Sequence, residues 1–105
     1  MPAKRPAPRL ALVNEQDMTE AQHALLASLR AGPRGASITP RGPFAAWMHA
    51  TELGELAQKL GAYCRYGTAL SPRLSEFAIL CTARLWRAQY EWFAHAPMAT
   101  RGGVK

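Results

Sequence analysis

Apolar residues recur every three to four positions along most of the chain, a spacing that predicts helices. The first helix is expected to begin at Asp17 or Thr19, because each starts a capping box with a Glu or Gln three residues later. Gly32-Pro33 should end it. The predicted apolar stripe of this helix comprises Ala21, Leu25 and Leu29, with Leu26 beside it.

Turn-forming residues dominate positions 32–43, which predicts a loop. A short helix is expected over residues 44–49, followed by a longer one from Thr51 to about Arg65. Apolar positions on the longer helix follow a 3.6-residue period, so they should form its inner face, with charged residues outside. The predicted inner face comprises Leu53, Leu56, Ala57, Leu60 and Cys64.

Ser71-Pro72 combines an N-cap serine with proline at the first helical position, and therefore predicts a helix start. From Leu74 to Trp86 the residues are apolar on nearly every side, which is typical of a central, buried helix. A last helix is expected over residues 88–100. Pro97 lies inside it and should kink or end it, because proline lacks the amide hydrogen.

The pattern predicts an all-α fold of four main helices, since no segment alternates with the period of a strand. The length of 105 residues suits one domain, expected over residues 10–105. Residues 1–9 contain three prolines and three basic side chains and are predicted to be a disordered tail. With 49% hydrophobic and 19% charged residues, the remainder is not a disordered chain.

Cys64 and Cys81 form no C-x-x-C motif and are expected to be reduced, buried thiols. No apolar segment of signal-peptide length follows the basic start. The longest unbroken apolar run has five residues, too few to span a membrane. These features predict a cytoplasmic protein.

Candidate chemistry lies in the last two predicted helices. Glu76 falls within the most apolar helix, where a carboxylate needs a partner. Glu91 and His95 are four residues apart and therefore share a helix face. Glutamate and histidine together suit proton transfer near neutral pH. Structural alternatives are an ion pair of Glu76 with Arg73 or Arg87, and an ordinary surface contact between Glu91 and His95.

These residues lie within a longer pattern that resembles the carboxymuconolactone decarboxylase family, which includes the alkylhydroperoxidase D-like proteins. The resemblance covers about residues 10–104. It implies an alkylhydroperoxidase D-like helical fold with a shortened C-terminus, assembled as a trimer or hexamer. The segments that carry it are 70–80 (LSPRLSEFAIL), 83–84 (AR), 90–95 (YEWFAH), 42–44 (GPF) and 60–67 (LGAYCRYG).

The peroxidase branch of that family has the two cysteines of a C-x-x-C where this chain has Ala88 and Glu91. It has histidine where this chain has Tyr90. Thiol-dependent peroxide reduction needs a reactive cysteine with a resolving partner. Cys81 lies only five residues after Glu76 and cannot replace that pair. Peroxiredoxin-type activity is therefore disfavoured, although it belongs to the family.

The resemblance then implies a lyase that performs acid–base chemistry on a small anionic carbon acid or lactone. His95 would donate or accept the proton, and Glu91 would orient and polarise the His95 ring. Glu76 would be a second acid–base group or a structural anchor. Tyr90 and Arg84 are expected to contact the substrate. The net charge of +6 favours an anionic molecule. No cofactor or metal ion is expected.

Other interpretations remain open. Glu76, Glu91 and His95 could hold a zinc or iron ion, although only one histidine takes part. The loop at 32–43 could be a lid that presents Arg34 or Arg41 to an anion. The chain could also be a non-catalytic assembly partner.

Nucleic-acid binding is the main rival from another class, because basic and aromatic residues interleave near the end of the chain. We expect it less, since the aromatic residues are better explained as core. The residues concerned are Arg84, Trp86, Arg87, Tyr90 and Trp92, with Trp86, Trp92 and Phe93 assigned to the core.

Overall fold

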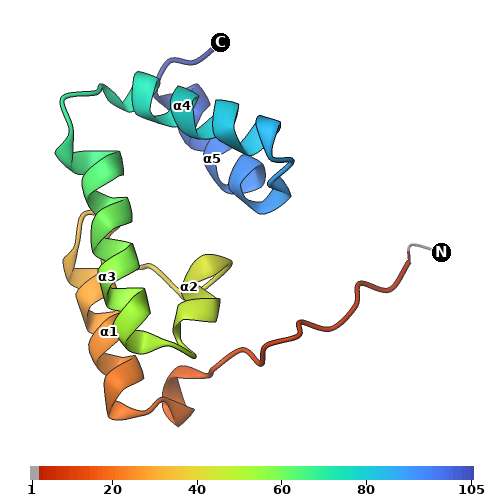
Figure 1. Ribbon diagram of the computed structural model, residues 1–105, viewed down its shortest axis with the longest axis vertical. Helices are drawn as coiled ribbons and strands as arrows, with labels where there is room; N and C mark the ends of the chain where they lie inside the picture. The colour runs from red at the N-terminus through yellow and green to blue at the C-terminus, as the bar shows by residue number, and fades with distance from the viewer. Residues whose placement is uncertain (1–2) are drawn as a thin grey trace. The chain divides into compact units, whose positions relative to one another are not determined.

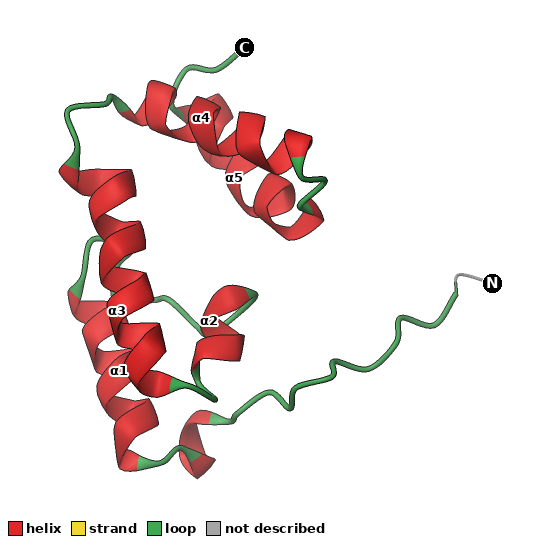
Figure 2. Ribbon diagram, viewed as in Figure 1, coloured by secondary structure: helices red, strands yellow, loops and turns green. Residues whose placement is uncertain are grey.

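The structure is a computed structural model that describes residues 3–105 (Figure 1). Across this range it is helical and contains no strand (Figure 2), which confirms the all-α prediction with four main helices. The elements in chain order are a 3-10 turn η1 (Glu15–Asp17), α1 (Glu20–Ala31), α2 (Pro43–Trp47), α3 (Thr51–Ala62), a π-helical turn η2 (Tyr63–Gly67), α4 (Pro72–Leu85) and α5 (Gln89–Arg101).

The chain divides into two compact units, residues 1–58 and 59–105, and each is described by itself. Residues 3–14 have no helix or strand. The predicted tail also includes residues 1–2, which lie outside the described residues. Its disorder stays a prediction, as does the single domain over residues 10–105. None of the helices in residues 3–105 is both long and apolar enough to cross a membrane.

Of the two predicted starts for α1, the structure uses Thr19. The Thr19 Oγ1 accepts a hydrogen bond from the Gln22 amide at 3.2 Å, and Gln22 Oε1 accepts one from the Thr19 amide at 2.9 Å. This reciprocal pair satisfies two amides that a helix start leaves free. Gly32 caps the other end, as predicted.

The core of the first unit is built on the apolar stripe of α1. Leu25, Leu26, Leu29 and Met48 are buried, and Phe44 and Trp47 of α2 pack against them. Ala21, expected in this stripe, is exposed instead.

The prediction for the inner face of α3 is wrong. Leu53, Leu56 and Leu60 are 60–66% exposed, whereas Gly54 and Gln58 are buried. A Cβ added to Gly54 would lie only 2.6 Å from Trp47 Cβ. Glycine therefore lets this face of α3 approach α2 closely, and the leucines on the other side are left uncovered.

Polar contacts hold the same face of α3 to the first helix. Ser28 Oγ donates to Glu55 Oε1 at 2.6 Å, and Gln58 Nε2 donates to Ser28 Oγ at 3.2 Å. Arg34 of the loop donates to the side-chain oxygen of Gln58 at 3.2 Å. Buried polar groups need such partners, so these bonds favour the orientation that hydrophobic periodicity missed.

In the second unit, α4 and α5 pack side by side (Figure 1). Ser71 Oγ caps α4 by accepting from the Leu74 amide at 3.3 Å, as predicted. Helix α5 does not end at Pro97 but continues to Arg101. Pro97 has no amide hydrogen, so the carbonyl of Phe93 lacks its usual donor four residues later.

Helix α4 is not the fully buried helix that its composition predicted. Ser75, Glu76, Leu80 and Ala83 are buried. The opposite side carries an exposed stripe, which we call the α4 stripe. It comprises Leu74, Phe77, Cys81 and Leu85, of which Phe77 is 52% and Leu85 77% exposed.

Predictions of burial for five further residues are also wrong. Trp86, Trp92 and Phe93, assigned to the core, are 76%, 46% and 75% exposed. Cys64 and Cys81 are exposed free thiols rather than buried ones. The common reason is that α4 packs only against α5 and η2 in the second unit, so each of its two long helices buries one face and leaves the other open.

Candidate active site

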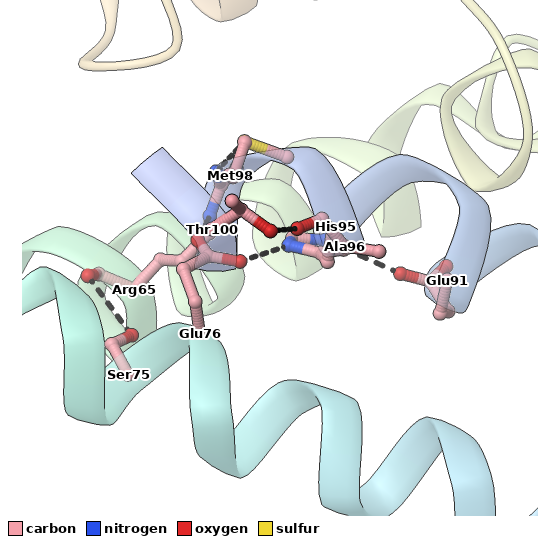
Figure 3. Close-up of polar contacts among 8 residues, drawn as sticks. All are labelled: Arg65, Ser75, Glu76, Glu91, His95, Ala96, Met98 and Thr100. Atoms are coloured by element: carbon pink, nitrogen blue, oxygen red, sulfur yellow. Dashed lines mark hydrogen bonds and ion pairs between the residues drawn. The ribbon is translucent and has the colours of Figure 1, made fainter. Parts of the chain in front are cut away.

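Glu76 and His95 meet between α4 and α5. The Glu76 Oε2 lies 2.6 Å from His95 Nδ1, and the two side chains are 8% and 12% exposed (Figure 3). Such a short separation is typical of a charge-assisted hydrogen bond. Glu76 is available at this place because it lies on the buried side of α4, and His95 because it lies on the side of α5 that packs there.

Glu91 lies one turn before His95 on α5, as its spacing predicted. Its Oε2 is 3.5 Å from His95 Nε2, and its side chain is 40% exposed. The imidazole therefore has one carboxylate at each ring nitrogen. The one at Nδ1 is buried, and the one at Nε2 faces partly toward solvent.

This arrangement favours one tautomer of His95. A carboxylate accepts hydrogen bonds, and the contact with Glu76 at 2.6 Å is much shorter than the contact with Glu91 at 3.5 Å, so the ring proton is assigned to Nδ1. In the neutral ring the lone pair then lies on Nε2, the nitrogen on the more open side. In this arrangement Nε2 of His95 can act as a base, while the Glu76 carboxylate at Nδ1 orients the ring.

The cation that pairs with Glu76 is Arg65, not Arg73 or Arg87. Arg65 comes from η2, and its Nε donates to Glu76 Oε1 at 3.1 Å. Its Nη2 donates to the sulfur of Met98 at 2.7 Å (Figure 3). Arg73 is exposed in the first turn of α4, and Arg87 lies beyond the end of α4 in a left-handed conformation.

Arg65 was not among the predicted partners of Glu76, which were Arg73 in the first turn of α4 and Arg87 just after its end. A usable signal was present, since a carboxylate on a buried helix face calls for a cation from another element. Arg65 directly follows the last position of the predicted apolar stripe of α3. The pairing of Arg65 with Glu76 depends on the path of the chain through η2, and residue propensities do not predict that turn.

The structure does not bring the expected substrate-binding residues to this cluster. Tyr90 is 41% exposed, and Arg84 is an exposed residue of the last turn of α4. Within residues 3–105, no hydrogen bond or ion pair joins either residue to Glu76 or His95. Their role in substrate binding stays a prediction.

A shared metal site is not supported by the arrangement. Glu76 and Glu91 contact opposite nitrogens of the same ring, so they do not converge on one point with it. No group of three His, Cys, Asp or Glu side chains in the described part of the chain is placed to hold a metal ion.

Comparison of the chain with protein-family models, with curated proteins and with solved structures finds no match. The case for a function therefore depends on the geometry of Glu76, Glu91 and His95 and on the sequence pattern around them.

Proposed function

We propose that the protein is a proton-transfer enzyme, similar to carboxymuconolactone decarboxylase, that acts on a small anionic carbon acid or lactone. The single observation that carries the proposal is the position of His95. Its Nδ1 is 2.6 Å from the buried Glu76, while its Nε2 lies on the side of the half-exposed Glu91. The resemblance of residues 70–95 to the family points to the same side chains.

In this proposal, Nε2 of His95 takes a proton from a carbon next to the substrate carbonyl and later returns it to another carbon or a leaving group. Glu76 accepts the Nδ1 hydrogen bond throughout, which orients the ring and stabilises its protonated form. Glu91 Oε2 lies 3.5 Å from Nε2, so its side chain would move aside when a substrate group approaches that nitrogen. The geometry thus favours Glu76 as the orienting group, a role expected for Glu91.

Charge supports an anionic substrate. Residues 59–105 contain seven basic and only two acidic side chains, and both acids, Glu76 and Glu91, contact His95. The other side chains of this unit therefore provide an excess of positive charge, which attracts anions.

A thiol peroxidase is disfavoured by the same structure. Cys81 lies on the α4 stripe, whereas Glu76 is on the buried side of that helix. No second cysteine of a C-x-x-C is present to resolve an oxidised thiol.

The test is an assay of carboxylate-bearing lactones with the wild type and with His95→Ala and Glu76→Gln. Loss of the base should lower the rate by about 10²–10⁴-fold. His23→Ala, at an exposed position of α1, is the matched control and should retain full activity. Turnover that is equal in all four proteins would remove the catalytic proposal and leave a non-catalytic assembly role.

We also propose that a second copy of the chain covers the α4 stripe. Its members Leu74, Phe77 and Leu85 are 41%, 52% and 77% exposed. A row of exposed apolar side chains along one helix face favours association.

A further inference from the structure

The π-helical turn η2 places one arginine at the back of the candidate site. Arg65 Nε donates to Glu76 Oε1 at 3.1 Å, and its Nη2 donates to Met98 Sδ at 2.7 Å. Its guanidinium carbon lies 4.8 Å from the centre of the Tyr66 ring. The Arg65 side chain is only 16% exposed, so these contacts largely define its position.

The two oxygens of Glu76 are thereby divided between two partners. Oε1 accepts from Arg65 and Oε2 faces His95 Nδ1 (Figure 3). A carboxylate bound at both oxygens cannot rotate without breaking one bond. Its orientation, and through it the orientation of the imidazole, therefore depends on Arg65.

The backbone of η2 is fixed to the same helix. Ser75, the neighbour of Glu76, donates from Oγ to the carbonyl of Arg65 at 3.4 Å. Gly67 closes the turn, and a Cβ there would lie 2.9 Å from the Tyr63 ring. π-Helical turns are rare and occur frequently at functional sites. Here the turn brings a side chain from outside α4 and α5 to their shared buried face.

We propose that Arg65 is a positioning residue that fixes the tautomer and orientation of His95 through Glu76. It touches no reacting atom, because Glu76 lies between it and the imidazole. This inference rests on the proposed function of His95 as the base. In general, removing a residue that orients a catalytic or metal-binding histidine lowers activity or metal affinity by about 10–100-fold.

The test is nuclear magnetic resonance of the His95 ring in protein labelled with ¹⁵N histidine. In the wild type we expect the proton on Nδ1, with a strongly deshielded signal from the hydrogen bond to Glu76. Arg65→Met should lose that signal and give a mixture of tautomers. Arg73→Met is the matched control, since Arg73 precedes Glu76 by three residues but is exposed, and it should leave the signal unchanged.

If Arg65→Met does not fold, Arg65→Gln is used in its place, because it keeps a hydrogen-bond donor but removes the charge. It should also lose the deshielded Nδ1 signal. A deshielded Nδ1 proton that persists in a folded Arg65 variant overturns the inference. So does a wild-type ring protonated on Nε2 alone, whatever the variants do. These readouts need no substrate, so failure to turn over lactones would count against the proposed function and not against the role of Arg65.

Discussion

Gly54 decides how closely α3 can lie to the rest of the first unit. A Cβ at this position would be 2.6 Å from Trp47 Cβ and 3.0 Å from Leu25 Cδ2. We predict that Gly54→Ala destabilises the protein by about 1–3 kcal/mol, because overpacking exceeds the gain in helix propensity. Thermal or denaturant unfolding measures this difference.

The matched control is Gly32→Ala, where the added carbon would lie 3.5 Å from its nearest neighbour, the carbonyl oxygen of Leu29. That change should have a much smaller effect. Equal stability of Gly54→Ala and the wild type would mean that α3 does not pack on Trp47 as described.

Individual residues differ in how well the sequence predicted them. Glu91 and His95 come together because residues four positions apart on a helix lie on the same face. The approach of Glu76 to His95 was expected from the pattern and is seen in the structure. Arg65 was not predicted, since its contact crosses 11 positions and depends on the irregular turn η2.

At the scale of elements, η1 is tied to α1 by an ion pair. Arg30 Nη1 and Nη2 donate to the two oxygens of Glu15 at 2.7 and 3.1 Å. The hydrogen bonds from Arg30 hold the pKa of Glu15 below its ordinary value, and those bonds in turn raise the pKa of Arg30. A lowered carboxyl pKa stabilises the folded state above the unfolded pKa, and this contribution disappears as pH falls through the folded pKa.

We therefore predict that Glu15→Gln lowers the free energy of unfolding near neutral pH and has a smaller effect at about pH 3, where the pH has fallen below the ordinary pKa of glutamate toward the lowered folded one. The difference should be small and should shrink with added salt, because both side chains are substantially exposed. Denaturant unfolding at both pH values measures it, with Glu52→Gln, at an exposed position of α3, as control. A larger effect of Glu15→Gln in acid than at neutral pH would contradict the assignment.

Helix boundaries were predicted better than helix faces. Thr19, Gly32 and Ser71 act locally, so their chemistry marks the ends of helices whatever surrounds them. Faces depend on tertiary partners. On α3, Gly54 and the hydrogen bonds of Gln58 outweigh a regular row of leucines, and no periodicity of the helix itself contains that information.

At the scale of the whole molecule, the exposed apolar surface leads to a prediction about assembly. The wild type should have a mass in solution of at least two chains of 11.5 kDa each. Phe77→Glu should lower this mass, because it would place a charge in the surface between the copies. Leu12→Glu is the control, since Leu12 is a 66% exposed leucine of the N-terminal segment. Light scattering coupled to size exclusion measures the mass.

A monomeric wild type would contradict the proposed self-association. If nucleic acid co-purifies at low salt and dissociates at high salt, the exposed tryptophans and arginines would instead be a nucleic-acid-binding surface. The core assignment of Trp86 and Trp92 no longer argues against that outcome, because both are exposed.

The position of Cys81 gives the chain an internal chemical probe. Its thiol lies in the middle of the α4 stripe, four residues after Phe77 and four before Leu85, whereas Cys64 is an exposed thiol in η2. A maleimide reagent should thus modify Cys64 at any protein concentration, while dilution should speed its reaction with Cys81 if neighbouring copies shield that sulfur. The ratio of the two labelling rates reads out assembly without any engineered tag.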